Sequence, residues 1–255
     1  MTDVTGSLGR ATGINNSGVV TGFAFLPGNS NTHAFLYTGG VITDLGTLPG
    51  GASAPFSQGN AINDSGTVVG TSKSEAMLDK SGQMSGFSSR AALNAYGVNS
   101  AGDIVGVLQS AHAFLFSGTN MKDLGTFDGS KNTYSAANGI NDLGQVVGFS
   151  YYSGNSVVHA FLYQNGVMSD LGTLYGGYSI ATGTNKQGDI VGESDGTAFL
   201  YHHGVMIDLS VVTSASGLLH ISRARAINDI GQIVGMGTFL NEGDHAILLT
   251  PIPAQ

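Results

Sequence analysis

Short apolar runs bounded by glycine and asparagine follow one another along the whole chain, and apolar positions never recur at helical spacing. Residues 135–140 and 145–149 are two such runs, and the turn Asn141-Asp-Leu-Gly144 between them is typical of a β-hairpin. Two further runs follow at 159–163 and 167–171, joined by Gln164-Asn-Gly166. The pattern predicts four antiparallel strands, which we call the first to fourth strand of a repeat, and almost no helix.

The turn between the first and second strands recurs six times as Asn-x-x-Gly, followed by apolar residues and a second glycine. The turn asparagines are Asn15, Asn63, Asn99, Asn141, Asn185 and Asn228, at intervals of 36 to 48 residues. Asparagine and glycine here are expected to provide the turn geometry, including positive φ. A period of about 40 residues built from short strands predicts an all-β, six-bladed β-propeller of four-stranded blades.

The third and fourth strands carry motifs of their own, which locate the end of the sixth repeat. The third strand reads His-Ala-Phe-Leu-Tyr or a variant, and the fourth contains Asp-Leu, as at Asp170-Leu171. The sixth repeat stops after its third strand, 245–249, whereas Met1-Thr-Asp3-Val4 matches the missing fourth strand. We therefore expect a single domain over residues 1–255, with residues 1–8 completing the blade formed by about 220–250, because closure removes exposed sheet edges.

These motifs resemble a known family. His-Ala-Phe-Leu-Tyr, Asp-Leu-Gly-Thr-Leu and Ile-Asn-x-x-Gly-x-Val-Val-Gly are similar to the repeats of the bacterial extracellular HAF-repeat family, and the match covers nearly the whole chain. The resemblance implies a secreted or surface protein and supplies no catalytic residues. The first ten residues lack a basic-then-apolar signal, so a cytoplasmic location stays open beside an extracellular or periplasmic one.

Composition narrows the range of partners. The formal net charge is −8 with nine Lys and Arg, which disfavours binding to nucleic acid or to an anionic membrane. The absence of cysteine excludes disulfides, thiol chemistry and zinc–thiolate sites. Charged residues are only 10% while apolar residues are 41%, which suits a β-rich surface over a packed core and not a disordered chain.

Residues that recur in every blade are expected to serve the scaffold. The third-strand histidines lie on separate blades, too far apart to share a metal ion, and we expect each to hydrogen-bond the backbone of a neighbouring blade. They are His33, His112, His159 and His245. The fourth-strand aspartate is expected to be a turn or sheet-edge partner. Pairs such as Asn141-Asp142 lack the further acidic ligands of a calcium loop, so no metal and no cofactor is predicted.

Function is expected where the blades differ. In a four-stranded blade the variable loops, which follow the second and fourth strands, emerge on one face. The first strand is innermost, and its residues three and five places before the turn asparagine are mostly polar. Candidate ligand-binding residues are Arg10, Gln58, Asn60, Asn94, Tyr96, Asn138, Thr182, Arg223 and Arg225.

Arg10, Arg223 and Arg225 are three of only four arginines, and ring closure would bring them together. Clustered guanidinium groups need a neutralising partner, which is either an Asp or Glu of the channel or an anionic ligand. An acidic saccharide or a small carboxylate fits the second alternative. Arg90, the fourth arginine, is expected on the same face.

Titratable and aromatic residues near that face leave catalysis open. His220, Tyr178, Tyr134 and Glu193 are candidates for proton transfer next to a carboxylate, as in a lyase or cyclase. The simpler interpretation is that such tyrosines and histidines stack on sugars or hold loops. Three functions therefore stay open: a binding propeller, an enzyme that uses the same pocket, and a protein-interaction platform.

Overall fold

The computed structural model describes residues 9–25, 31–49, 56–87, 92–152, 157–211, 213 and 217–252. The chain divides into two compact units, Met1–Asp123 and Leu124–Gln255, which are considered separately below. Within the described ranges all regular secondary structure is β-strand. None of these residues lies in a helix with the length and apolar character needed to cross a bilayer.

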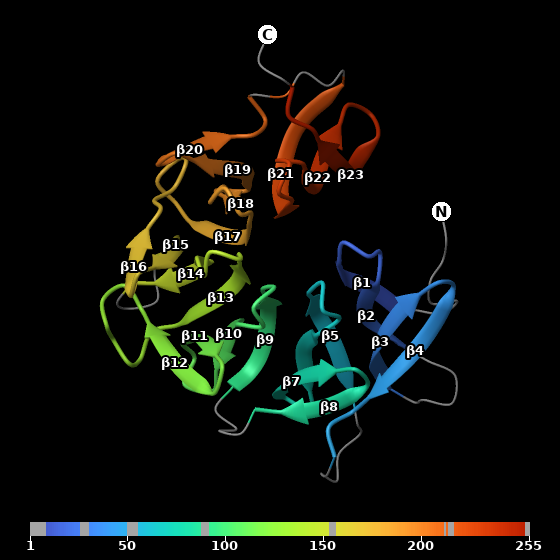
Figure 1. Cartoon of the computed structure of the whole chain (residues 1–255). Helices are drawn as coiled ribbons and strands as arrows, with labels where there is room; N and C mark the ends of the chain where they lie inside the picture. Colours follow the sequence, from blue (N-terminus) through green and yellow to red (C-terminus); the bar gives the residue numbers. More distant parts are fainter. Residues whose placement is uncertain are drawn as a thin grey trace. The chain divides into compact units, whose positions relative to one another are not determined.

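The first unit contains three antiparallel sheets in which strands consecutive in sequence are neighbours (Figure 1). The first sheet consists of β1 (Gly9–Ile14), β2 (Val20–Phe25), β3 (Thr32–Thr38) and β4 (Val41–Gly46). The second consists of β5 (Ser57–Ile62), β6 (Val68–Ser72), β7 (Glu75–Lys80) and β8 (Gln83–Gly86). The third consists of β9 (Ala92–Val98), β10 (Ile104–Leu108), β11 (Ala113–Ser117) and β12 (Asn120–Gly125).

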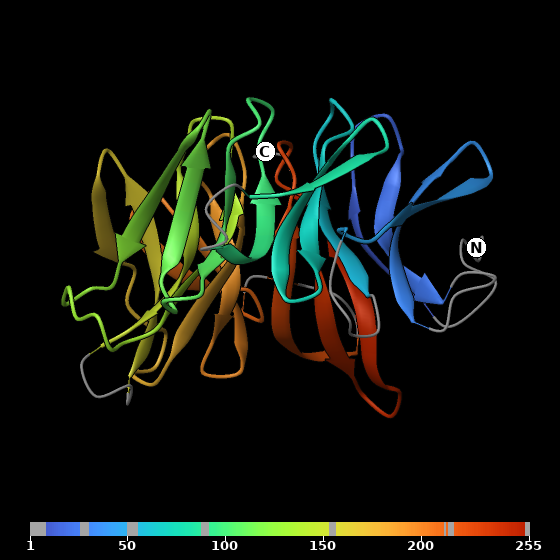
Figure 2. The same ribbon diagram turned by 90° about the horizontal axis from the view of Figure 1, so that it is seen from below.

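The second unit repeats this arrangement, and Figure 2 shows the successive hairpins from a second direction. Its first sheet consists of β13 (Ser135–Ile140), β14 (Val146–Tyr151), β15 (Val158–Gln164) and β16 (Val167–Asp170). The next consists of β17 (Ser179–Thr184), β18 (Ile190–Ser194), β19 (Thr197–His202) and β20 (Val205–Asp208). The last contains β21 (Leu218–Ile227), β22 (Ile233–Phe239) and β23 (Gly243–Leu249).

The predicted fold class is confirmed: the protein is all-β, with six successive blades of the β-propeller type. The predicted strand boundaries agree with the observed ones to within a few residues, as in β13 to β16. The sixth blade has three strands among the described residues. Its predicted fourth strand, residues 1–8, and Arg90 both lie outside the described residues.

The turn asparagine holds its own hairpin and also binds the next blade. Asn141 Oδ1 accepts the backbone N–H groups of Leu143 and Gln145 at 3.1 and 3.0 Å, which closes the turn. Gly144 follows with φ of 74°, as predicted. Asn141 Nδ2 donates to the carbonyl of Asn185, the turn asparagine of the next blade, at 2.8 Å. Asn15, Asn63 and Asn185 make the same inter-blade bond.

The second glycine of the repeat is required by a β-bulge in the first strand. A Cβ at Gly148 would lie 2.0 Å from the carbonyl oxygen of Ala136, far inside van der Waals contact. The register between β13 and β14 shifts there, so that Asn138 is left without a partner across the ladder. Equivalent shifts occur in the other blades. The side chain three residues before each turn asparagine is therefore the extra residue of a bulge.

Within each unit the core lies between adjacent blades, and the third strands contribute its largest buried side chains. The phenylalanines Phe35, Phe114, Phe161 and Phe199 are fully buried, and so are the alanines that precede them. Around Phe199, for example, Val147, Ala160 and Leu171 from one blade pack against Ala181 and Ile190 from the next. Because each blade covers its neighbour, the apolar faces of the sheets are removed from water.

Gly148→Ala should destabilise the protein by more than about 3 kcal/mol, because the backbone of the bulge has to move to admit a methyl group. Gly166→Ala is the control, since its Cβ would meet open space and only the positive φ opposes it, at about 1 kcal/mol. Urea unfolding of both variants measures the difference. Equal losses would show that the bulge does not need glycine.

Candidate functional site

Three predicted ligand-binding residues bind the neighbouring blade. Asn60 Nδ2 donates to the carbonyl of Ala95, and Asn138 Nδ2 donates to that of Ala181, both at 2.8 Å. Thr182 Oγ1 donates to the carbonyl of Ala224 at 2.9 Å, and Thr12 makes the matching bond to Gly59 at 2.6 Å. All four are bulged residues, and each carbonyl lies four places before the next turn asparagine. The side-chain donor groups of these four residues therefore join each blade to the next.

The first-strand residue two places before the bulged residue contacts the second strand of the preceding blade. Thr71 Oγ1 in β6 makes a short hydrogen bond to Asn94 Oδ1 in β9. The equivalent pair in the second unit is Glu193 in β18 with Arg223 in β21, and here the contact is an ion pair through Nε of the guanidinium. Arg223 therefore has the acidic partner that the sequence analysis gave as one of its two alternatives.

Four residues predicted from the sequence gather around Gly196. The phenol of Tyr178 donates to Glu193 Oε1 in a short hydrogen bond and accepts the N–H of Gly196 at 3.1 Å. Glu193 Oε2 accepts from Arg223. His220 Nε2 lies 2.8 Å from the carbonyl oxygen of Gly196. We call Tyr178, Glu193, Arg223 and His220 the Gly196 cluster.

A tight hairpin positions this cluster. Asp195 and Gly196 form the two-residue connection between β18 and β19, with φ of 52° and 76°, as a type I′ turn requires. Asp195 also orders the segment before β17, because its Oδ1 accepts the N–H of Tyr178 at 2.9 Å and its Oδ2 accepts that of Tyr175 at 3.0 Å. The sequence analysis missed Asp195, although the Asp-Gly dipeptide between two apolar runs is a recognised hairpin signal.

The electrostatics of the cluster favour fixed charges over proton transfer. Burial of Glu193 would raise its pKa, but the hydrogen bonds from Arg223 and Tyr178 outweigh burial and hold the pKa below its ordinary value. The bond to Glu193 raises the pKa of Tyr178, and it also raises the pKa of Arg223. At neutral pH the cluster thus contains a carboxylate, a guanidinium and a neutral phenol.

His220 uses both ring nitrogens within the protein. Because a carbonyl oxygen only accepts, Nε2 carries the proton in the bond to Gly196. Nδ1 lies 3.3 Å from the hydroxyl of Ser210, and the same hydroxyl accepts the N–H of Ile221 at 2.9 Å. The ring of His220 in β21 is therefore held between the Gly196 turn and Ser210, which follows β20, and each nitrogen has a partner within the protein.

The remaining candidates lie elsewhere. Tyr134 packs against Phe149 and Tyr151, with ring centroids 5.6 and 6.2 Å apart, and not within the Gly196 cluster. Burial raises the pKa of Tyr96, although a hydrogen bond with Asn94 lowers it. Arg10 lies exposed in β1 and Gln58 lies in β5, both in the first unit. Arg225 is exposed in β21, and its charge helps to lower the pKa of Glu193.

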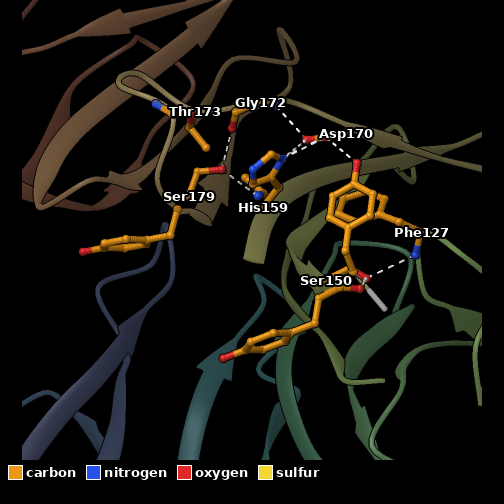
Figure 3. A network of polar contacts seen from close by, with 12 residues as sticks. Phe127, Ser150, His159, Asp170, Gly172, Thr173 and Ser179 are labelled. Atoms are coloured by element: carbon orange, nitrogen blue, oxygen red, sulfur yellow. Dashed lines mark hydrogen bonds and ion pairs between the residues drawn. The ribbon is translucent and has the colours of Figure 1, made fainter. Parts of the chain in front are cut away.

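The third-strand histidines have a different partner from the one predicted. His33, His112 and His159 direct Nδ1 at the fourth-strand aspartate of their own blade, with Nδ1–carboxylate distances of 2.8 to 3.0 Å. Figure 3 shows His159 directed at Asp170. The link to the next blade comes instead from Ser179, whose hydroxyl accepts the N–H of Ala160 and donates to the carbonyl of Gly172. The aspartate also accepts the N–H of the glycine two residues on, as a turn partner should.

Metal binding gains no support from the described residues: nowhere in these ranges do three His, Asp or Glu side chains gather as a metal ion would require.

Comparisons with known proteins add little. No family model and no curated protein matches this chain. Among solved structures, dipeptidyl peptidase 4 from Porphyromonas gingivalis is 8% identical with a TM-score of 0.48, over 93% of this chain and 44% of the peptidase. A triple mutant of AofleA from Arthrobotrys oligospora is 13% identical with a TM-score of 0.42, over 96% of this chain and 88% of that one. Likenesses this weak carry no functional inference.

Asn138→Ala should lower the free energy of unfolding by about 1–2 kcal/mol, because it removes one hydrogen bond between blades and leaves the carbonyl of Ala181 without its donor. Asn120→Ala, at the exposed start of β12, is the control and should change stability by less than about 0.5 kcal/mol. Chemical unfolding measures both. A neutral Asn138→Ala would remove the inter-blade role.

Glu193→Gln should lower stability at pH 7 by about 1–2 kcal/mol, because the Arg223 charge loses its partner. The pKa of Glu193 is lower in the folded than in the unfolded chain, so the ionised carboxylate stabilises the fold above the unfolded pKa of about 4.3. That contribution is lost as the pH falls from the unfolded pKa through the lower folded pKa, and the two proteins should converge only once the pH is below the folded pKa. Thermal melts from pH 3 to 8 test this, with the exposed Glu242→Gln as control.

Proposed function

We propose that this chain is a ligand-binding β-propeller and that its ligand is an acidic saccharide or a small carboxylate. Arg223 is the residue to which we assign the main contact with the anion. One observation carries the proposal: the side chain of Glu193 is only 11% exposed and holds Nε of Arg223, while the side chain of Arg223 stays 40% exposed. A buried carboxylate thus fixes the direction of a guanidinium that still reaches solvent.

This arrangement suits recognition of a carboxylate. Among the described residues Arg223 makes its one polar side-chain contact through Nε, so the two terminal nitrogens remain for a bidentate bond to an anion. Arg225 adds a second positive charge close enough to help lower the pKa of Glu193. Tyr178 places an aromatic ring in the same cluster, and such rings commonly pack against sugars.

The enzyme alternative has weaker support. A lyase or cyclase acting beside a carboxylate needs a base. Tyr178 has a raised pKa and donates a hydrogen bond to Glu193, and both nitrogens of His220 are bonded within the protein. Binding without turnover is therefore our first proposal. The extracellular location that the HAF resemblance implies is part of the same proposal, since saccharides and carboxylates are accessible there.

Calorimetry against uronic acids and small carboxylates, with the corresponding neutral sugars alongside, tests the proposal. Arg223→Ala should weaken binding of the acidic ligand at least tenfold, because a charge-assisted bidentate bond is lost. Lys186→Ala is the matched control: it removes one positive charge from an exposed pair with Asp229 in the same unit and should leave the affinity unchanged.

Other outcomes separate the alternatives. Equal affinity for neutral and acidic sugars, or an unchanged affinity in Arg223→Ala, would rule out anion recognition at this site. Arg10→Ala, measured alone, tests whether the first-blade arginine belongs to the same site. Mass spectrometry of the incubated ligand detects turnover, and a product that His220→Ala or Tyr178→Phe abolishes would favour the enzyme.

A further inference from the structure

Tyr175 is a largely exposed aromatic residue that the protein holds at both ends. It lies between β16 and β17 and is 66% exposed. Its backbone N–H donates to Asp195 Oδ2 at 3.0 Å, and its hydroxyl donates to Asp208 Oδ2 at 2.6 Å. The bond to Asp208 raises the pKa of Tyr175, so the phenol remains a neutral donor at pH 7. The ring is thus fixed in place while much of it remains in contact with solvent.

The sequence of the fifth blade provides the partner for this hydroxyl. In the first and fourth blades the fourth-strand aspartate binds the third-strand histidine. Thr197 replaces that histidine in the fifth blade, where Asp208 accepts the hydroxyl of Tyr175 instead. Tyr175 itself departs from the repeat, because Pro49 and Asp128 stand at its place in the loops that follow β4 and β12. Such differences between blades are where we expect function.

A second tyrosine makes the same bond, but its ring is packed within the protein. The hydroxyl of Tyr152 donates to Asp170 Oδ2 at 2.7 Å. Phe127 stacks on the ring of Tyr152 with centroids 5.0 Å apart, and the ring of His159 meets it edge-on at 5.5 Å. Among the described residues no aromatic ring packs against Tyr175 in this way. A tyrosine bound to the fourth-strand aspartate is therefore covered in the fourth blade and accessible in the fifth.

Tyr175 is connected to the Gly196 cluster through one carboxylate. Asp195 accepts the N–H of Tyr175 with one oxygen and that of Tyr178 with the other. Tyr178 donates to Glu193, which holds Arg223. Three side chains thus follow one another between the exposed ring and the guanidinium, and a ligand that touches both needs more than one sugar unit.

We propose that Tyr175 is a stacking platform for a pyranose ring, and that the ligand is an acidic oligosaccharide of two or more sugars and not a small carboxylate. This assignment rests on the proposed function, in which Arg223 binds the carboxylate of one sugar while a neighbouring sugar lies on Tyr175. The C–H groups on the face of a sugar ring are attracted to the negative face of an aromatic ring and gain dispersion contacts there. A ring that two hydrogen bonds already hold loses little freedom when the ligand binds, which favours affinity.

Calorimetry with galacturonic acid and with trigalacturonic acid tests the platform. The parent protein should bind the trimer about tenfold more tightly than the monomer, or better, because only the trimer reaches both groups. Tyr175→Ala should remove this advantage and leave the affinity for the monomer unchanged. Tyr175→Phe keeps the ring and should retain trimer binding to within about threefold. Leu143→Ala is the control, since Leu143 is also about two-thirds exposed, at 69%, but lies in the turn between β13 and β14.

The outcomes for Tyr175 and Arg223 can be told apart. Full trimer affinity in a Tyr175→Ala variant that melts as the parent does would overturn the platform, and a loss confined to Arg223→Ala would leave the proposed function standing without it. The trimethyl ester of the trimer carries no charge. Equal binding of this ester, lost in Tyr175→Ala but not in Arg223→Ala, would retain the platform and overturn anion recognition. If the parent binds neither the trimer nor its ester, both proposals are wrong.

Discussion

The structure of every blade depends on one close approach between backbone atoms. The second glycine of the repeat passes so close to a carbonyl oxygen of the first strand that a Cβ added to it would lie only 1.9 Å from that oxygen at Gly70 and 2.3 Å at Gly235. This approach produces the bulge, and the bulge turns one side chain of the first strand out of the ladder. Asn60, Asn138 and Thr182 reach the next blade for this reason.

The bulge also decides which inner positions are available for function. The bulged residue needs only a hydrogen-bond donor for the next blade, which asparagine and threonine both provide. The residue two places earlier faces the second strand of the preceding blade, and this contact varies from neutral Thr71–Asn94 to charged Glu193–Arg223. At these two junctions the pair of positions differs in charge, whereas the bonds of the bulged residue and of the turn asparagine are repeated.

Most of the fold could be read from the sequence because its signals are local. The turn glycines, the period and the alternating strands act within a few residues, so Gly144 and its hairpin were predictable. Contacts between blades were not. The partners of Asn138 and Asn141 lie 43 and 44 residues away, and nothing near either residue marks the distant carbonyl. The histidine–aspartate pairs span 11 residues, and their constant spacing was a usable signal that the prediction of a backbone partner overlooked.

The candidate site was also predictable only in part: its residues could be chosen from the sequence, but their contacts could not. Tyr178, Glu193, Arg223 and His220 could be selected as titratable or charged residues near the face of the variable loops. The sequence did not show that the Asp195-Gly196 turn brings a backbone N–H to Tyr178 and a carbonyl to His220. The scaffold bonds of the turn asparagine and the bulge persist at this junction, with Thr182 and Asn185 still joined to the sixth blade. The ion pair is therefore an addition to a junction whose repeated bonds are already made, which is compatible with the anion recognition that we propose for Arg223.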